Sequence, residues 1–159
     1  MSAFLLYGSA HEGDGDVTAS VVNHVGLCVH DIDRSQRFYE ELFGFEYERE
    51  IAPPDDPTGR LLQVEAPVGL RAVYLRKDGL LLELLAYTRR PARPPRERPM
   101  DEPGLTHISV GADNHRRILD RVEALGGQVV TQTDIGVAVF IRDPDGQLIE
   151  LLETKRPSG

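Results

Sequence analysis

The chain has 159 residues, a formal net charge of −8 at pH 7 and a sequence pI near 5.1. A chain of this length can bury a full core as one compact domain. Its acidity argues against a nucleic-acid partner, because binding to a phosphate backbone needs clustered positive charge. No apolar run approaches the roughly 20 residues of a membrane span, and the single cysteine, Cys28, excludes an internal disulfide framework. We expect a cytoplasmic protein without a membrane partner, in which Cys28 is a small core residue.

Changes in composition divide the chain into an arm, two modules, a linker and a tail. Glycine, aspartate and serine are frequent at the end of the arm, and the linker holds five arginines and five prolines. The predicted ranges are 1–20 for the flexible N-terminal arm, 21–88 for the first module, 89–103 for the linker, 104–153 for the second module and 154–159 for the tail.

The first module begins with a predicted strand at 21–29. Asp31 or Asp33 can cap a helix that runs through Leu42, and Gly44 supplies the left-handed residue that ends such a helix. Short β-runs follow. The module therefore reads β-α-β-β-β.

A stretch rich in proline and acidic residues, Glu48–Val68, makes the first module longer than the second. We expect a loop in this stretch, placed to close over a pocket.

The second module repeats the plan of the first. Thr106–Val110 reads as a strand, Asp113 or Asn114 can cap the next helix, and apolar residues at helical spacing continue to Gly126 and Gly127. The strands and hairpin turn expected to complete it are 129–131, 137–141, the turn 143–146 and 147–152.

One octapeptide pattern occurs in both modules, at Asp78–Leu85 and again at Asp145–Leu152. Each copy places a glutamate, Glu83 or Glu150, in a strand whose two faces are both apolar. A buried carboxylate is costly unless a partner compensates it. Each glutamate therefore needs a buried partner.

Each module also carries one histidine in its first predicted strand, His24 or His107. A lone histidine in a strand is more often a core or surface residue, but two at matching positions of a repeat favour a shared role. Two neutral imidazoles and two carboxylates form a charge-balanced ligand set for Zn, Mn, Co, Ni or Fe(II). We therefore expect one divalent metal ion per site, held by His24, Glu83, His107 and Glu150.

Other candidate residues have less support from spacing. Surface positions are expected for the remaining histidines, which are His11, His30 and His115. The arginines of 89–98 have the charge to bind a phosphate or carboxylate, although a solvated linker explains them as well. Glu65 and Tyr87 are possible pocket residues.

Together these features resemble the vicinal oxygen chelate superfamily, the glyoxalase/bleomycin resistance/dioxygenase group. The resemblance covers residues 22–153 and rests on Asn23-His24-Val25-Gly26, Phe38-Tyr39 with Leu42 and Gly44, Leu82-Glu83-Leu84, Leu105-Thr106-His107-Ile108, and Asp143-Pro144-Asp145-Gly146 leading to Ile149-Glu150-Leu151. It implies an α+β, glyoxalase-like fold in which two tandem βαβββ modules form a cupped mixed sheet around a metal site. His24, Glu83, His107 and Glu150 match the four ligand positions of the family.

Two observations narrow the branch of the family to which the chain is most similar: its ligand set, and two positions at which it differs from known branches. Four retained ligands fit glyoxalase I and the acyl-CoA and keto-cyclitol epimerases better than the bleomycin-binding, ring-cleaving or fosfomycin-modifying members. Glyoxalase I commonly has an arginine four residues after its first ligand, where this chain has Cys28. The second catalytic glutamate of methylmalonyl-CoA epimerase falls at Pro67, two residues from Glu65. These departures favour a related epimerase or isomerase.

The resemblance thus implies a metal-dependent epimerase or isomerase that acts through an enolate on a small carbonyl substrate of keto-cyclitol, keto-sugar or acyl-CoA type. Glu83 and Glu150 would be the catalytic groups that take and return the proton. The alternatives are a glyoxalase I-like lyase on thiol adducts, a ring-cleaving dioxygenase and a natural-product-binding resistance protein. A homodimer is expected, with the site either within one chain or across the interface.

Overall fold

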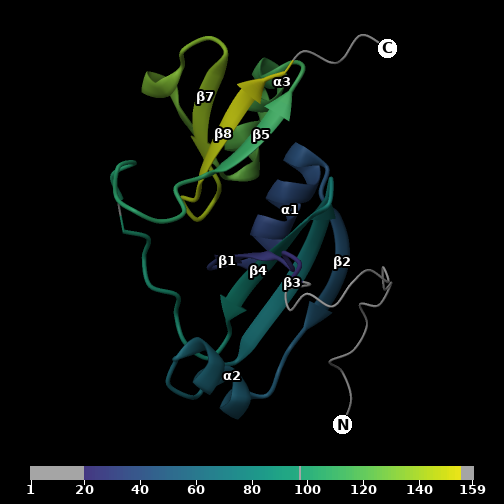
Figure 1. The fold of residues 1–159 in the computed structure, drawn as a ribbon, viewed down its shortest axis with the longest axis vertical. Helices are drawn as coiled ribbons and strands as arrows, with labels where there is room; N and C mark the ends of the chain where they lie inside the picture. The colour runs from purple at the N-terminus through teal and green to yellow at the C-terminus, as the bar shows by residue number, and fades with distance from the viewer. Residues whose placement is uncertain (1–19, 97, 155–159) are drawn as a thin grey trace, which may run out of the picture.

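The computed structural model describes residues 20–96 and 98–154 (Figure 1). The elements of the first module are β1 (Val25–Cys28), α1 (Ile32–Phe43), β2 (Glu46–Ile51), α2 (Asp55–Leu62), β3 (Leu70–Lys77) and β4 (Leu80–Tyr87). Those of the second are β5 (Ile108–Ala112), α3 (His115–Val122), the 3₁₀ helices η1 (Glu123–Leu125) and η2 (Thr131–Thr133), β6 (Gln128–Val130), β7 (Ala138–Arg142) and β8 (Leu148–Glu153). Within 20–96 and 98–154, no helix has the length and apolar character needed to cross a membrane. Apart from Ser20 and Thr154, the predicted arm and tail lie outside the described residues.

The two modules form two four-stranded sheets with the same topology. The strand orders are β1-β4-β3-β2 and β5-β8-β7-β6, and in each sheet the first pair is parallel while the other pairs are antiparallel. The predicted α+β fold with two βαβββ units is confirmed, with α2 as an addition to the first unit.

Local sequence signals set the limits of α1. The Asp31 side chain accepts a hydrogen bond from the backbone N–H of Arg34, and Gly44 ends the helix in the left-handed conformation with φ 70°. Both features were expected from the sequence. The buried face of α1 carries Phe38 and Tyr39, which are 0% and 1% exposed.

The loop expected over Glu48–Val68 is wrong for much of that stretch, because β2 extends to Ile51 and α2 spans Asp55–Leu62. Acidic side chains in the first turn of α2 favour helix formation through the helix dipole. Pro57 also lies in this first turn, where its missing N–H leaves no helical hydrogen bond unmade. A composition that suggests a loop therefore also suits the start of a short helix.

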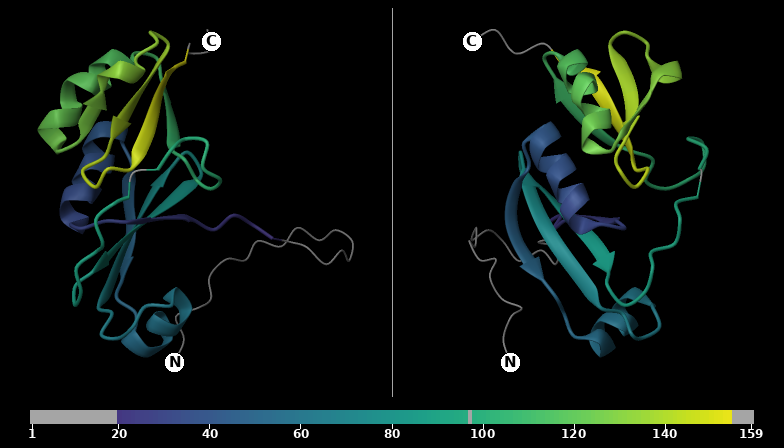
Figure 2. Two further views of the ribbon diagram at one scale, coloured as in Figure 1. Left: turned by 90° about the vertical axis from the view of Figure 1, so that its left-hand side faces the viewer. Right: turned by 180° about the vertical axis from the view of Figure 1, so that it is seen from behind.

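One hydrophobic core serves both modules. Helix α1 packs on β3 and β4 of its own sheet and also contacts α3 and η1 of the second module, so the helices of the two modules lie together (Figure 2). The buried cluster takes Phe38 and Leu84 from the first module and Ile149 and Leu151 from the second. Side chains alternate along a strand. Glu83 lies between the core residues Leu82 and Leu84, and Glu150 lies between Ile149 and Leu151, so both glutamates point away from the shared core.

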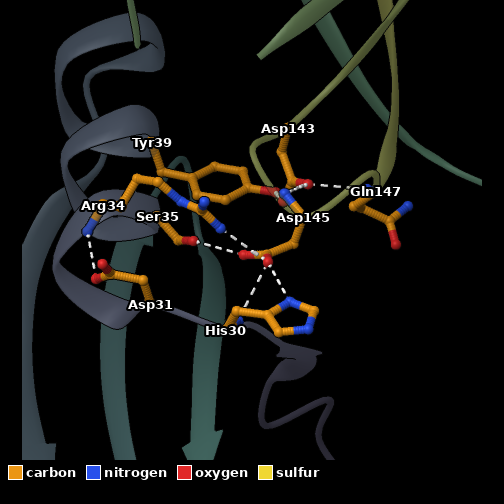
Figure 3. Close-up of polar contacts among 8 residues, drawn as sticks. All are labelled: His30, Asp31, Arg34, Ser35, Tyr39, Asp143, Asp145 and Gln147. Carbon is orange, nitrogen blue, oxygen red and sulfur yellow. Dashed lines mark hydrogen bonds and ion pairs between the residues drawn. The ribbon is translucent and has the colours of Figure 1, made fainter. Parts of the chain in front are cut away.

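A polar cluster also joins the modules; we call its residues, His30, Arg34, Ser35 and Asp145, the intermodule clasp (Figure 3). Asp145, on the β7–β8 loop, accepts hydrogen bonds from His30 Nδ1 at 2.6 Å, from Arg34 at 2.9 Å and from Ser35 Oγ at 3.0 Å. His30 was expected only to be a surface residue. Its side chain is partly exposed, but it also pairs with the second module.

Neighbouring carboxylates of the β7–β8 loop have opposite pKa shifts. Burial acts to raise the pKa of Asp145, but the hydrogen bonds from His30, Ser35 and Arg34 outweigh it, so the pKa lies below its usual value. Burial raises the pKa of Asp143, which accepts a hydrogen bond from the Tyr39 hydroxyl at 2.9 Å. The loop thus binds α1 through two carboxylates in different environments.

Candidate metal centre

The first predicted ligand pair is formed where β1 runs parallel to β4. Gly26 pairs with Glu83 in the register of these strands, and His24 lies directly before β1. His24 Nε2 is 3.0 Å from Glu83 Oε2. Glu83 is 8% exposed, so its carboxylate needs the buried partner expected from the sequence.

Asn23 sets the hydrogen position on the His24 ring. Its Oδ1 lies 2.7 Å from His24 Nδ1, and an amide oxygen can only accept, so Nδ1 carries the hydrogen and donates it. In the neutral ring, the lone pair of Nε2 then faces the Glu83 carboxylate at 3.0 Å. Two acceptors this close repel each other unless a proton or a cation lies between them.

The spacing of the two acceptors fits a divalent ion. Metal–ligand bonds of about 2.1 Å that meet at a right angle place their donor atoms about 3 Å apart. The 3.0 Å between His24 Nε2 and Glu83 Oε2 matches this separation. Imidazole nitrogen with carboxylate oxygen is also a donor set that divalent transition metals accept. The residues present therefore fit a metal ion.

Tyr74 and Arg49 extend the first pair across the sheet. In strand register Tyr74 of β3 lies opposite Glu83, and Arg49 of β2 lies opposite Tyr74. The Tyr74 hydroxyl donates a hydrogen bond to Glu83 Oε1, and the Arg49 guanidinium lies 4.0 Å from the centre of the Tyr74 ring. Burial, together with the bond to Glu83, raises the pKa of Tyr74 to about 12.

The second predicted pair, His107 and Glu150, is more open. His107 Nε2 is 3.9 Å from Glu150 Oε2, and both side chains are 28% exposed. Ser109 Oγ donates to Glu150 Oε2 at 2.6 Å. The Thr106 hydroxyl lies 2.9 Å from His107 Nδ1, which places a polar partner on this ring as Asn23 does on the other.

The four predicted ligands do not meet within one chain. Among residues 20–96 and 98–154, no three His, Cys, Asp or Glu side chains come close enough to share a metal ion. The reason lies in the packing, because the modules meet through their helices and shared core while each pair lies on the sheet face turned away from that core. The structure therefore holds the ligand set as two separate pairs.

Other candidate residues are dispersed. Tyr87 is half-buried on β4, and Glu65 is exposed, with its backbone oxygen bound by Arg90. Among the linker arginines, Arg89 pairs with Asp55 and Arg98 donates to the carbonyl oxygens of Leu105 and Glu102. These arginines bind neighbouring parts of the chain at separate places.

Two expectations about burial are wrong. Cys28 is exposed, because it shares its strand face with His24 and Gly26 and not with the core residues between them. His115 is only 3% exposed, because α3 packs on β6 and β8 and buries its first residue as well as its last, Val122. A helix N-terminus and a lone cysteine are thus poor guides to burial.

Sequence reasoning did not identify Asn23, Thr106, Tyr74, Arg49 and Ser109 as contacts of the ligands or of their partners. A repeated signal was present for the first two, since each ligand histidine follows directly after a polar side chain. The others contact a glutamate, or one another, only through strand pairing. Their identification requires the register of the sheets.

Comparison with known proteins gives the chain a family context. The family model "Glyoxalase/Bleomycin resistance protein/Dioxygenase superfamily" matches residues 21–151. A curated relative, probable lactoylglutathione lyase of Vibrio parahaemolyticus, is 26% identical over 140 residues that cover 85% of this chain and 91% of the relative.

Solved structures share the fold. Glyoxalase I of Leishmania major, described as trypanothione-dependent, matches with a TM-score of 0.61 and 24% identity over 81% of this chain and 83% of its own. The fosfomycin resistance protein FosX of Listeria monocytogenes, in complex with Mn(II) and sulfate, matches with a TM-score of 0.59 and 17% identity over 87% of this chain and 96% of its own.

Proposed function

The chain belongs to the glyoxalase/bleomycin resistance protein/dioxygenase superfamily, and on this premise we propose that it is a metal-dependent epimerase or isomerase of a small carbonyl compound. The observation that carries the proposal is the His24 Nε2 lone pair facing Glu83 Oε2 at 3.0 Å. This arrangement suits a cation shared between the two side chains. A bound divalent ion would supply Lewis-acid stabilisation of charge on the substrate oxygen.

His24, Glu83, His107 and Glu150 would hold the ion, with the two pairs supplied by different chains of a homodimer. Each pair alone offers two donors, fewer than the three protein ligands of a typical catalytic site. Both pairs lie on faces turned from the shared core of their own chain, and the side chains of His24, His107 and Glu150 remain partly exposed there. The face of β8 also leaves Leu152 38% exposed, as an interface residue would be in an isolated chain.

The two glutamates also supply the proton chemistry of the proposal. An enolate forms when the carbon next to a carbonyl loses its proton to a nearby base. Glu83 and Glu150 are the carboxylates next to the proposed substrate position, one from each module. Either carboxylate would serve as the base, and return of a proton to the opposite face, by the other carboxylate or by a water, would invert that carbon, which is the step an epimerase requires.

A glyoxalase I-like lyase on thiol adducts is the second candidate. It is favoured by the relative from Vibrio parahaemolyticus, which is 26% identical and described as a probable lactoylglutathione lyase. The same metal-binding and proton-transfer groups would serve this reaction, so the candidates differ in substrate and not in machinery.

Metal analysis and proton exchange test the proposal. The purified protein is expected to bind Zn²⁺ or Mn²⁺ and, with metal, to exchange substrate hydrogen for solvent deuterium in a keto-sugar, acyl-CoA ester or hemithioacetal. Exchange only with the hemithioacetal would favour the lyase. A protein that binds no divalent metal and catalyses no exchange would contradict both candidates.

A further inference from the structure

The two halves of the proposed site are equivalent in backbone and different in side chains. In strand register, the row through the first glutamate is Gly26, Glu83, Tyr74 and Arg49, on β1, β4, β3 and β2. The matching row of the second module is Ser109, Glu150, Phe140 and Val130, on β5, β8, β7 and β6. All three other residues of the row differ between the two modules.

These substitutions leave different oxygens of the two glutamates available. Tyr74 donates to Glu83 Oε1, which leaves Oε2 facing His24 at 3.0 Å. In the second module Phe140 has no hydroxyl, and Ser109 instead occupies Oε2 of Glu150, the oxygen nearest His107. Glu83 is therefore already oriented for a metal ion, whereas Glu150 is not.

The residue on the other side of each glutamate adds to this difference. A Cβ at position 26 would lie in van der Waals contact with Glu83 Oε2, at 3.5 Å, and glycine leaves that side of the oxygen without a side chain. Ser109 occupies the equivalent position beside Glu150 and donates to its carboxylate.

Tyr74 is itself held in place. Its hydroxyl is bonded to Glu83, its ring meets the His24 ring edge-to-face at 5.7 Å, and the Arg49 guanidinium covers the ring at 4.0 Å. Arg49 is in turn paired with Glu48. Tyr74 is 6% exposed and contacts both proposed ligands of the first module, His24 and Glu83.

We propose that Tyr74 is a positioning residue that gives the two repeated glutamates different tasks. It bonds Oε1 of Glu83 and so keeps Oε2 directed at the metal position, whereas Glu150, which is bonded by Ser109 and by no tyrosine, is the carboxylate that exchanges a proton with substrate. This inference rests on the proposed metal-dependent function. Its physical basis is that hydrogen bonds to a ligand set the ligand's orientation and typically change metal affinity by about 10- to 100-fold.

Zn²⁺ affinity, measured by competition with a chromophoric chelator, tests the proposal without a substrate. Tyr74→Phe, which copies the aromatic residue of the second row, is expected to weaken Zn²⁺ binding by about 10- to 100-fold. The matched control is Tyr47→Phe, because Tyr47 lies in the same sheet with its side chain 53% exposed. The visible spectrum of bound Co²⁺ should change in Tyr74→Phe and not in Tyr47→Phe.

A purely structural hydroxyl gives a different result. It would lower the thermal midpoint of the metal-free protein and leave Zn²⁺ affinity and the Co²⁺ spectrum unchanged. Circular dichroism of each metal-free variant verifies its fold before titration.

A second pair of variants tests the division of tasks. Glu83→Gln is expected to weaken Zn²⁺ binding more than Glu150→Gln does. Equal losses in these variants, or wild-type affinity in Tyr74→Phe, would overturn the inference while the proposed function stands. A wild-type protein that binds no Zn²⁺ would overturn both.

Discussion

Asp145 accepts a hydrogen bond from His30 Nδ1 at 2.6 Å, although 115 positions separate them in the sequence. Asp145 opens the second copy of the repeated octapeptide, and its side chain is 7% exposed. The equivalent residue of the first copy, Asp78, lies in the β3–β4 hairpin with its side chain 84% exposed. One repeated aspartate therefore forms a turn, and the other joins the modules.

Replacement of Asp145 by asparagine should destabilise the protein. The change removes the charge that pairs with Arg34 and His30, and we expect the free energy of unfolding to fall by about 2 kcal/mol, since both partners are partly exposed. Urea denaturation measures this loss. Asp78→Asn is the matched control and should change stability by no more than about 0.5 kcal/mol. Equal losses in the two variants would contradict a clasp at Asp145.

The contribution of Asp145 should depend on pH in the acid range. Its pKa is lowered in the folded state, so the folded protein binds this proton less readily than the unfolded chain does. The stabilisation is fully present above the unfolded pKa of about 3.9 and is lost as the pH falls through the lower folded value. The difference in unfolding free energy between wild type and Asp145→Asn should therefore shrink below about pH 4.

The effect of Asp143 on the pH dependence of stability has the opposite sign, because burial raises the pKa of Asp143 in the folded state. The charge of Asp145 is one of the causes that raise the Asp143 pKa, so the comparison is repeated in an Asp143→Asn background, which removes the Asp143 contribution from both proteins. A difference between wild type and Asp145→Asn that stays constant to the lowest pH of reversible unfolding would argue against the Asp145 assignment.

Complementation between two inactive variants should reveal a site shared by two chains. Glu83→Gln and Glu150→Gln are each altered in a different module, so a mixed dimer has one site with both original glutamates and one with neither. Random subunit exchange should restore about a quarter of the wild-type activity. Deuterium incorporation into the substrate by the Zn²⁺-loaded mixture measures this fraction. A mixture no more active than its components would contradict a site shared by two chains.

Asn23→Ala should weaken Zn²⁺ binding by about tenfold, because Asn23 Oδ1 holds His24 in the tautomer that presents Nε2. Isothermal titration calorimetry measures the change. Asn114→Ala, at the exposed start of α3, provides a control for the same substitution, since the Asn114 side chain makes no capping hydrogen bond there. Matching affinities in the two variants would show that Asn23 does not orient the ring.

Local patterns were sufficient to predict α1 and the βαβββ succession of elements along each module. Asp31 and Gly44 act on backbone groups within a few residues of themselves, so their effect does not depend on distant packing. The β3–β4 hairpin is similarly local, with Asp78 and Gly79 both at positive φ, as a two-residue turn requires.

The contacts between modules could not be predicted in the same way. The repeat identified His24, Glu83, His107 and Glu150 as a set, but alternation along a strand does not say which face meets the other module. Asp145 illustrates the limit, because the residues that bond its side chain lie more than 100 positions away. Asp145 is equivalent to Asp78 in the repeat, but its contact with Ser35 of α1 gives it a different environment.

The shared core determines what would follow if the linker were cut. Phe38 of one module and Ile149 of the other are both fully buried in a single cluster. Each separated fragment would therefore expose a hydrophobic surface that is complementary to the other fragment. Cleavage between the modules should therefore give a split protein whose fragments recombine, and not two independent miniature proteins.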